Sequence, residues 1–264
     1  MNRIVLIALA LIAATALFAL KGCGQPEEAT VTTPAASTAA PTEAAPAQDN
    51  QTETAAAIDP AAERIQMAQV DLSSVEAAGY IEGRHYTLIS PAQPTNTPPG
   101  QVEVNEFFMH SCIHCYNLEP FIEAWLQTKP DFINFVRVPT TWDEVRILHA
   151  QAYYAAESLD VVDEIMMPFF REFHDVGNYL ETPAKLTSFF GRFGVSAEEF
   201  ENHFSSFSVI TKVNNAAQLG QRYRIDSTPQ LVVNGKYRLG VDSAGGTDQL
   251  FELIELLAAA ERGQ

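Results

Sequence analysis

Two cysteines spaced as C-x-x-C, Cys112 and Cys115, constrain this chain more than any other feature, because of the segments on either side of them. Residues 102–109 are apolar and β-prone, whereas residues 116–128 have a helix-forming composition. With Ser111 as the predicted N-cap, Cys112 is the first helical residue and Cys115 lies one turn later on the same side. Because a helix N-terminus stabilises a thiolate, this position indicates redox chemistry.

The cysteine count favours chemistry over a structural bridge. The chain has three cysteines, and the third is Cys23, close to the N-terminus. An exported protein with structural disulfides usually has a larger, even set of widely spaced cysteines. Cys112 and Cys115 would close a very small loop, which adds little chain-entropy stabilisation. A zinc site is an alternative, since His110 and His114 stand beside the cysteines, but no second ligand pair has finger spacing, and we predict no metal.

The N-terminus has the layout of an export signal. Residues 4–20 form an uninterrupted apolar run after Arg3, which suits a signal peptide and is near the lower length limit of a membrane span. The run ends in Leu20-Lys21-Gly22-Cys23, which is similar to the bacterial lipobox, although Lys21 departs from its usual small or apolar residue. Lipidation of Cys23, ordinary signal cleavage and a retained anchor all stay open. Each of them places the rest of the chain outside the cytoplasm.

Composition divides the remaining chain into three parts. Residues 24–57 are rich in Ala, Thr, Pro, Gln and Glu and predict a disordered tether after the export segment 1–23. Residues 58–79 predict a short helical extension opened by Asp59-Pro60. Residues 80–264 are long enough for one domain with a sizeable core. The formal net charge of −17 argues against nucleic-acid binding, which needs a basic face, and we expect a monomer.

The folded part has the pattern of an α/β unit interrupted by helices. Strands are expected at 85–90, 102–109 and 132–138, with a helix at 111–128 before the third. This order predicts a parallel pair joined by a right-handed crossover. Residues 142–206 contain no convincing strand and predict an inserted helical block. Its helices are expected at 145–159, 161–173, 182–193 and 197–204.

The chain after the block returns to strands. A helix at 209–223 leads to a turn and strand at 227–233. Asn234-Gly235 is a strong signal for a type I′ hairpin, with the return strand at 236–239. An amphipathic helix at 248–260 closes the domain.

Several independent positions now carry a specific resemblance. The C-x-x-C motif follows a buried strand and contains His114, while Pro120 stands five residues after Cys115. Thr228-Pro229 enters a strand further along the chain. Together with the helical insertion, these features resemble the thioredoxin superfamily and, within it, the DsbA family of periplasmic dithiol oxidases, over residues 80–264. The resemblance implies an α/β thioredoxin fold with an inserted all-helical subdomain.

The resemblance also implies roles for the residues of the motif. Cys112 is expected to be the sulfur that substrate thiolates attack, and Cys115 the less exposed sulfur that leaves and later re-forms the bond. Helix N–H groups, the local dipole and His114 are expected to lower the pKa of Cys112. Glu106, six residues before Cys112, and Glu119, four after Cys115, correspond to acidic residues near the DsbA thiol pair. Glu106 is expected to relay protons to Cys115.

Three further positions complete the expected site. Thr228 and Pro229 match the cis-proline loop of the superfamily, and the Thr228 backbone is expected to pair with an extended substrate. Ile113 stands where the family more often has proline. Because this dipeptide tunes the redox poise, the resemblance leaves the potential open.

The implied function is a thiol:disulfide oxidoreductase that oxidises cysteine pairs of exported proteins in the periplasm. It would need no cofactor besides the Cys112–Cys115 disulfide. Its implied partners are partly folded exported proteins with reduced cysteines and a DsbB-like membrane protein that reoxidises it. The alternatives are a reductase or isomerase of the same superfamily and, from another class, a metal-binding or chaperone module.

Overall fold

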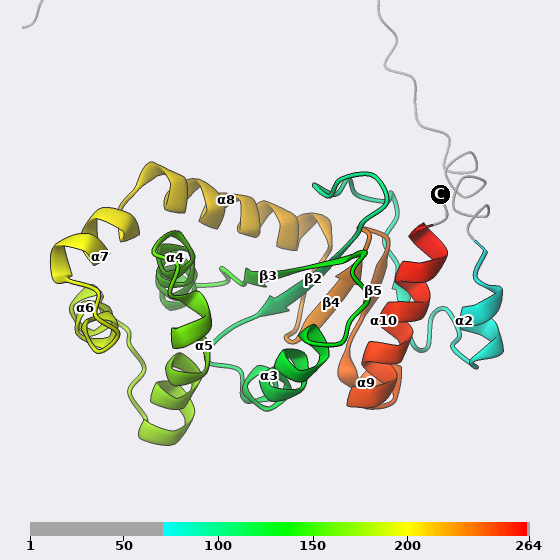
Figure 1. Ribbon diagram of the computed structural model, residues 1–264, viewed down its shortest axis with the longest axis horizontal. Helices are drawn as coiled ribbons and strands as arrows, with labels where there is room; N and C mark the ends of the chain where they lie inside the picture. The colour runs from blue at the N-terminus through cyan, green and yellow to red at the C-terminus, as the bar shows by residue number, and fades with distance from the viewer. Residues whose placement is uncertain (1–70, 263–264) are drawn as a thin grey trace, which may run out of the picture. The chain divides into compact units, whose positions relative to one another are not determined.

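A mixed five-stranded sheet organises the protein, with the strand order β1-β5-β4-β2-β3. The computed structural model describes residues 71–262, which lie in one compact unit (Figure 1). The strands are β1 (Thr87–Leu88), β2 (Val102–Phe108), β3 (Ile133–Pro139), β4 (Gln230–Val233) and β5 (Tyr237–Leu239). Every residue of β2 is buried, as expected for a strand that is covered on both faces.

The redox motif lies in the crossover between two parallel strands. Helix α3 (Ile113–Leu126) connects β2 to β3, which pair in parallel with Val104 opposite Phe135. Pro120 lies inside α3. On its other side β2 pairs with β4 in antiparallel orientation. The predicted parallel crossover is therefore confirmed, and it brings the end of β2 directly into the N-terminus of α3.

The hairpin between β4 and β5 is also confirmed. Asn234 and Gly235 both have positive φ angles, 49° and 63°, as a type I′ turn requires. A side chain at Gly235 would also meet the Gln93 carbonyl oxygen at 2.2 Å, so the close approach of this loop adds a second requirement for glycine. β1 pairs with β5 and forms the outer strand on this side of the sheet.

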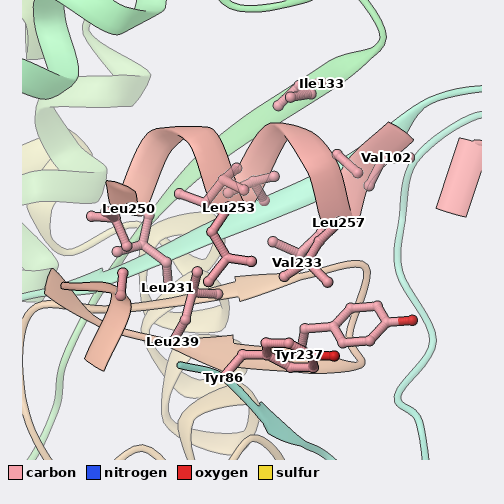
Figure 2. Close-up of a cluster of buried hydrophobic side chains, with 14 of the residues drawn as sticks. Tyr86, Val102, Ile133, Leu231, Val233, Tyr237, Leu239, Leu250, Leu253 and Leu257 are labelled. Atoms are coloured by element: carbon pink, nitrogen blue, oxygen red, sulfur yellow. The ribbon is translucent and has the colours of Figure 1, made fainter. Parts of the chain in front are cut away.

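One face of the sheet is covered by α3 and by three further helices. α10 (Thr247–Arg262) places Leu250, Leu253 and Leu257 against strand residues such as Leu231 and Val233 (Figure 2). Short helices α2 (Ser73–Ala77) and α9 (Val241–Ala244) contact α10 at its margins. Burial of each large apolar side chain contributes about 1.5–3 kcal/mol, which makes this cluster a main source of stability.

The inserted helices form a core of their own on the other side (Figure 1). They are α4 (Glu144–Ser158), α5 (Val162–Arg171), a π-helical turn η1 (Glu172–Val176), α6 (Pro183–Gly191) and α7 (Ala197–Phe204). α8 (Phe207–Arg222) returns the chain to the sheet and packs along α4. The thioredoxin-like α/β fold with a helical insertion is thus confirmed, although a single helix was predicted where α5 and η1 stand.

Two local predictions are wrong in extent. The strand expected at 85–90 is limited to Thr87–Leu88, because only these residues pair with β5. The helix expected at 111–128 begins at Ile113, because Cys112 is its N-cap residue.

The predicted export segment 1–23, the tether 24–57 and most of the extension 58–79 lie outside the described residues. Among residues 71–262, no helix is long and apolar enough to cross a membrane.

Candidate functional site

Cys112 itself caps helix α3, which corrects the prediction that Ser111 would do so. The Cys112 backbone is extended, with φ −89° and ψ 115°, and its Sγ accepts a hydrogen bond from the Cys115 N–H over 3.4 Å. The Ser111 hydroxyl has no hydrogen-bond partner within residues 71–262. A sulfur at the N-cap points at the unpaired N–H groups of the first helical turn, where negative charge is most stable.

The two sulfurs have unequal surroundings. Both are free thiols; Cys112 is 7% exposed and Cys115 is completely buried. The Cys112 thiol donates a hydrogen bond of 3.2 Å to the Thr228 carbonyl, which brings the loop before β4 against the motif. The Thr228–Pro229 peptide bond is cis. Residues that are 116 positions apart in sequence therefore form one site.

This arrangement separates the acidities of the two thiols. Hydrogen bonding from the Cys115 thiol is the largest of the effects that lower the pKa of Cys112 to about 5, although burial opposes it. The Thr228 side chain and the backbone N–H groups of Cys115 and His114 lower it further. Burial raises the pKa of Cys115 far above its ordinary value, and the hydrogen bond with Cys112 adds to this effect. Cys112 is thus the sulfur that can be a thiolate at neutral pH.

The causes of the low Cys112 pKa differ in part from those expected. The helix N–H groups contribute, but the larger effect comes from Cys115, and the contribution of His114 comes from its backbone. The side chains of Ile113 and His114 are exposed at the surface beside the motif. His114 lines a cleft of about 620 Å³, together with Leu118 and Phe121 of α3.

This cleft joins the motif to the neighbouring loop and sheet edge. Besides α3, it is lined by residues 227–230, which include Thr228 and Pro229, and by Tyr86 and Thr87 near the outer strand. Residues 239–243 also line it. The cleft therefore joins the exposed side of α3 and the Thr228–Pro229 loop in one concave surface.

A buried carboxyl group acts electrostatically on Cys115. Glu106 is completely buried on β2, and neither of its carboxyl oxygens has a hydrogen-bond partner within the described residues. Burial raises the pKa of Glu106, and the Glu119 charge raises it further, while Arg137 opposes both. The Glu106 charge in turn raises the pKa of Cys115. A carboxyl group in this environment can hold a proton at neutral pH.

Arg137 is a site residue that the sequence did not indicate. It lies on β3 directly opposite Glu106 in the parallel register, and its Nε is 3.7 Å from the Glu106 carboxyl. Its terminal nitrogen contacts Glu119 at 2.5 Å and Glu123 at 2.6 Å. Burial raises the pKa of the Glu119 carboxyl, and Arg137 opposes this rise. One guanidinium thus contacts three carboxyl groups and compensates their charge in part.

His110 was considered as a metal ligand, but its ring is packed into the core. It is 2% exposed and stacks on Phe169 with ring centroids 3.9 Å apart. Burial keeps the pKa of His110 well below its ordinary value. Within residues 71–262, no group of three or more His, Cys, Asp or Glu side chains is arranged to hold a metal ion.

The comparisons with known proteins agree with this geometry. A family model described as "DSBA-like thioredoxin domain" matches residues 135–257, a range that begins after the two cysteines. The thiol:disulfide interchange protein DsbA of Burkholderia cepacia is 35% identical over 186 residues, which are 69% of this chain and 88% of that protein. The protein of the same name from Pseudomonas aeruginosa is 32% identical over 196 residues, 74% of this chain and 92% of that protein.

Solved structures lead to the same family. The crystal structure of Pseudomonas aeruginosa DsbA has a TM-score of 0.67 and 33% identity, covering 71% of this chain and 97% of that chain. The oxidoreductase DsbA from Xylella fastidiosa has a TM-score of 0.64 and 26% identity, covering 70% and 98%. The fold, the thiol pair and these relatives show that the chain belongs to the DsbA family of thiol:disulfide interchange proteins and is a thiol:disulfide oxidoreductase.

Proposed function

We propose that the protein works in the oxidising direction and introduces disulfides into exported proteins. The observation that carries this proposal is the position of the Cys112 sulfur at the N-cap of α3, where it accepts a hydrogen bond from the Cys115 N–H. Hydrogen bonding with Cys115 and the other neighbours lowers the pKa of Cys112 to about 5, which stabilises its thiolate. A disulfide whose reduced form contains a stabilised thiolate is readily reduced, so it acts as an oxidant towards ordinary thiols. A low thiolate pKa also makes Cys112 a good leaving group in the last step.

The cycle starts from the Cys112–Cys115 disulfide. A substrate thiolate attacks Cys112 Sγ, the Cys112–Cys115 bond breaks, and Cys115 leaves and takes up a proton. A second substrate thiolate then attacks the substrate sulfur of the mixed disulfide, and Cys112 leaves as a thiolate. The substrate has lost two electrons and gained a disulfide, and the protein holds two electrons as its dithiol. The greater exposure of Cys112 supports its role as the attacked sulfur.

Glu106 is the proposed proton donor and acceptor for Cys115. Burial raises the pKa of Glu106, and its charge acts on Cys115, so the carboxyl can supply the proton when Cys115 leaves. It can accept the same proton back when the pair is reoxidised. Glu119 and Arg137 act on this exchange through the charge that they place beside Glu106.

The surface around Cys112 is the proposed substrate-binding site. The Thr228 backbone lies next to the Cys112 sulfur, where it can pair with the backbone of an extended substrate that carries the reacting cysteine. Pro229 and His114 line the cleft that would receive the flanking residues. Ile113 contributes an exposed apolar side chain to the same surface.

The proposed location is the periplasm, where a quinone-linked membrane protein of the DsbB type would reoxidise the dithiol. Lipidation of Cys23 would hold the protein at a membrane, with 24–57 as a tether and 58–79 as an extension of the domain 80–264. The apolar run before Cys23 supports export.

The first prediction concerns the sulfur that substrate thiolates attack. In an oxidising buffer with a reduced, unfolded substrate that carries a single cysteine, the Cys115→Ser protein should accumulate a mixed disulfide through Cys112, because neither a second protein thiol nor a second substrate thiol can resolve it. Non-reducing gels and mass spectrometry detect this species. The Cys112→Ser protein, which keeps the buried Cys115, should accumulate none and should not oxidise the substrate. Substrate oxidation by Cys112→Ser, or net reduction of substrate disulfides by the wild-type dithiol, would contradict the proposal.

The second prediction concerns Glu106. The Glu106→Gln protein should react at least about tenfold more slowly in the step that releases Cys115, because it lacks the proton donor. Since burial raises the folded pKa of Glu106 above its unfolded value, ionisation of Glu106 costs stability as pH rises above about 4.5. The variant should therefore be more stable than wild type at pH 8 and lose this advantage towards pH 4, as measured by urea unfolding.

Glu123→Gln is the matched control, because Glu123 contacts Arg137 but is half exposed. It should change neither the rate nor the pH dependence of stability appreciably. Equal effects of the two substitutions would show that the rate depends on the charge around Arg137 and not on a proton held at Glu106.

The third prediction concerns the anchor. After expression in a bacterium that processes lipoproteins, the mature protein should enter the detergent phase of a phase split and carry an acyl modification on Cys23. The Cys23→Ala protein should lack the modification. Wild-type protein in the aqueous phase with an unmodified N-terminus would rule out the lipid anchor.

A further inference from the structure

A set of aromatic and polar contacts joins the redox helix to the helical insertion. Tyr116, the residue after Cys115, stacks on His174 of η1 with ring centroids 5.2 Å apart and planes at 6°. The Tyr116 hydroxyl donates a hydrogen bond of 2.9 Å to the carboxylate of Asp175, also on η1. We call Tyr116, His174 and Asp175 the η1 clamp. It contacts α3 in the same turn that carries the two cysteines.

The clamp also contacts the backbone just before Cys112. His174 Nε2 lies 2.9 Å from the backbone carbonyl oxygen of His110. A carbonyl can only accept, so Nε2 carries the hydrogen and His174 is the donor. His110 lies inside the turn that ends with a hydrogen bond of 3.0 Å from the Cys112 N–H to the Met109 carbonyl. The imidazole therefore holds a peptide group in the turn that orients Cys112.

The η1 turn is itself fixed to the helical insertion. Glu172, its first residue, is buried and accepts hydrogen bonds from the side chains of Asn178 and Arg192. Its backbone carbonyl accepts from the Asn178 N–H over 2.7 Å. Gly177 ends the turn with φ 75°. π-Helical turns often stand at functional sites, where the extra residue re-aims side chains. Here the turn directs His174 and Asp175 towards α3.

We propose that His174 is a positioning residue of the thiol–disulfide reaction, because it holds the His110 peptide and thereby fixes the Cys112 sulfur over the first N–H groups of α3. The clamp thus gives the helical insertion a role in setting the redox properties of the pair. His174 does not touch the reacting sulfurs in this assignment. It acts through the backbone, whose conformation at Cys112 decides whether Sγ faces the Cys115 N–H.

The size of the effect follows from the contact involved. One hydrogen bond from a side chain to a backbone carbonyl contributes roughly 0.5–1.5 kcal/mol, equivalent to about a two- to tenfold change in an equilibrium. Loss of the bond lets the His110–Ser111 peptide rotate and weakens the contact between the Cys112 sulfur and the helix N-terminus. The thiolate becomes less stable, and the disulfide becomes a weaker oxidant.

The test compares two replacements of His174 in the full protein. His174→Phe keeps a ring to stack on Tyr116 but removes the donor, whereas His174→Gln restores an N–H donor without the ring. The Cys112 pKa is read from thiolate absorbance at 240 nm in the reduced protein, and the disulfide–dithiol equilibrium from glutathione buffers. His174→Phe should raise the Cys112 pKa by about 0.3–1 and shift the glutathione equilibrium about two- to tenfold towards the oxidised protein.

His174→Gln should return both quantities close to their wild-type values. His203→Phe is the control, because His203 lies on α7, which packs on α4 and α6, and its ring bonds the Ser158 hydroxyl of α4. It should change neither quantity. A wild-type pKa in His174→Phe, or equal shifts in His174→Phe and His174→Gln, would overturn the proposal, since the donor would then be irrelevant.

Tyr116→Phe provides a second test that keeps the ring stack and removes only the hydrogen bond to Asp175. It should raise the Cys112 pKa less than His174→Phe does, because the His174 donor remains. A larger rise than in His174→Phe would contradict the assignment. The proposal rests on thiol–disulfide chemistry at Cys112 but not on its direction, since this pKa is measured without a substrate and stays informative even if the protein proves to be a reductase.

Discussion

The hydrogen bonds that the Cys112 sulfur receives at the N-terminus of α3 are the interactions on which the chemistry of this protein depends. Cys112 takes the N-cap position itself, so its sulfur replaces the side-chain oxygen that usually satisfies the first helical N–H groups. A thiolate there gains both hydrogen bonds and the helix dipole. Cys115, one turn later, is completely buried and stays protonated. The fold thus lowers the pKa of one sulfur and raises the pKa of the other.

The rest of the site maintains this inequality. β2 ends at the motif, and its burial on both faces fixes the direction from which the chain enters α3. Glu106 and Arg137 lie opposite each other on β2 and β3, and the Glu106 charge raises the pKa of Cys115. A cluster of buried charges costs desolvation energy unless opposite charges compensate one another. Arg137 carries one positive charge among three carboxyl groups, so the compensation is only partial. Burial and the Glu119 charge therefore raise the pKa of Glu106 despite the opposing charge of Arg137. A raised pKa is the property that a proton relay needs.

Much of the fold was predictable because it depends on local patterns. The position of Cys112 and Cys115 between a β-prone run and a helix predicted the crossover, and Asn234-Gly235 predicted the hairpin. The absence of a convincing strand in residues 142–206 predicted the helical insertion. The sequence also carried the resemblance to the DsbA family.

The missed features depend on tertiary contacts. Ser111 and Cys112 are both compatible with an N-cap, and only the backbone geometry at Cys112 decides between them. Arg137 became a site residue through the register of β3 against β2, which the sequence does not specify. The η1 turn has hydrogen bonds between residues five apart, where an α-helix has them between residues four apart. The spacing of apolar residues over such a short segment does not distinguish the two. His174 and His110 meet only once the insertion has packed on α3.

Equilibration with glutathione buffers tests the central claim most directly, because it compares the stability of the Cys112 thiolate in the reduced protein with that of the disulfide. Potentials of about −120 mV for DsbA and about −270 mV for thioredoxin mark the two ends of the range. Because the thiolate is stabilised at the N-terminus of α3, the pair should be largely reduced in buffers that leave ordinary protein disulfides intact, with a potential nearer to that of DsbA. A potential near that of thioredoxin would contradict the account, since the contacts at Cys112 would then not make the disulfide an oxidant.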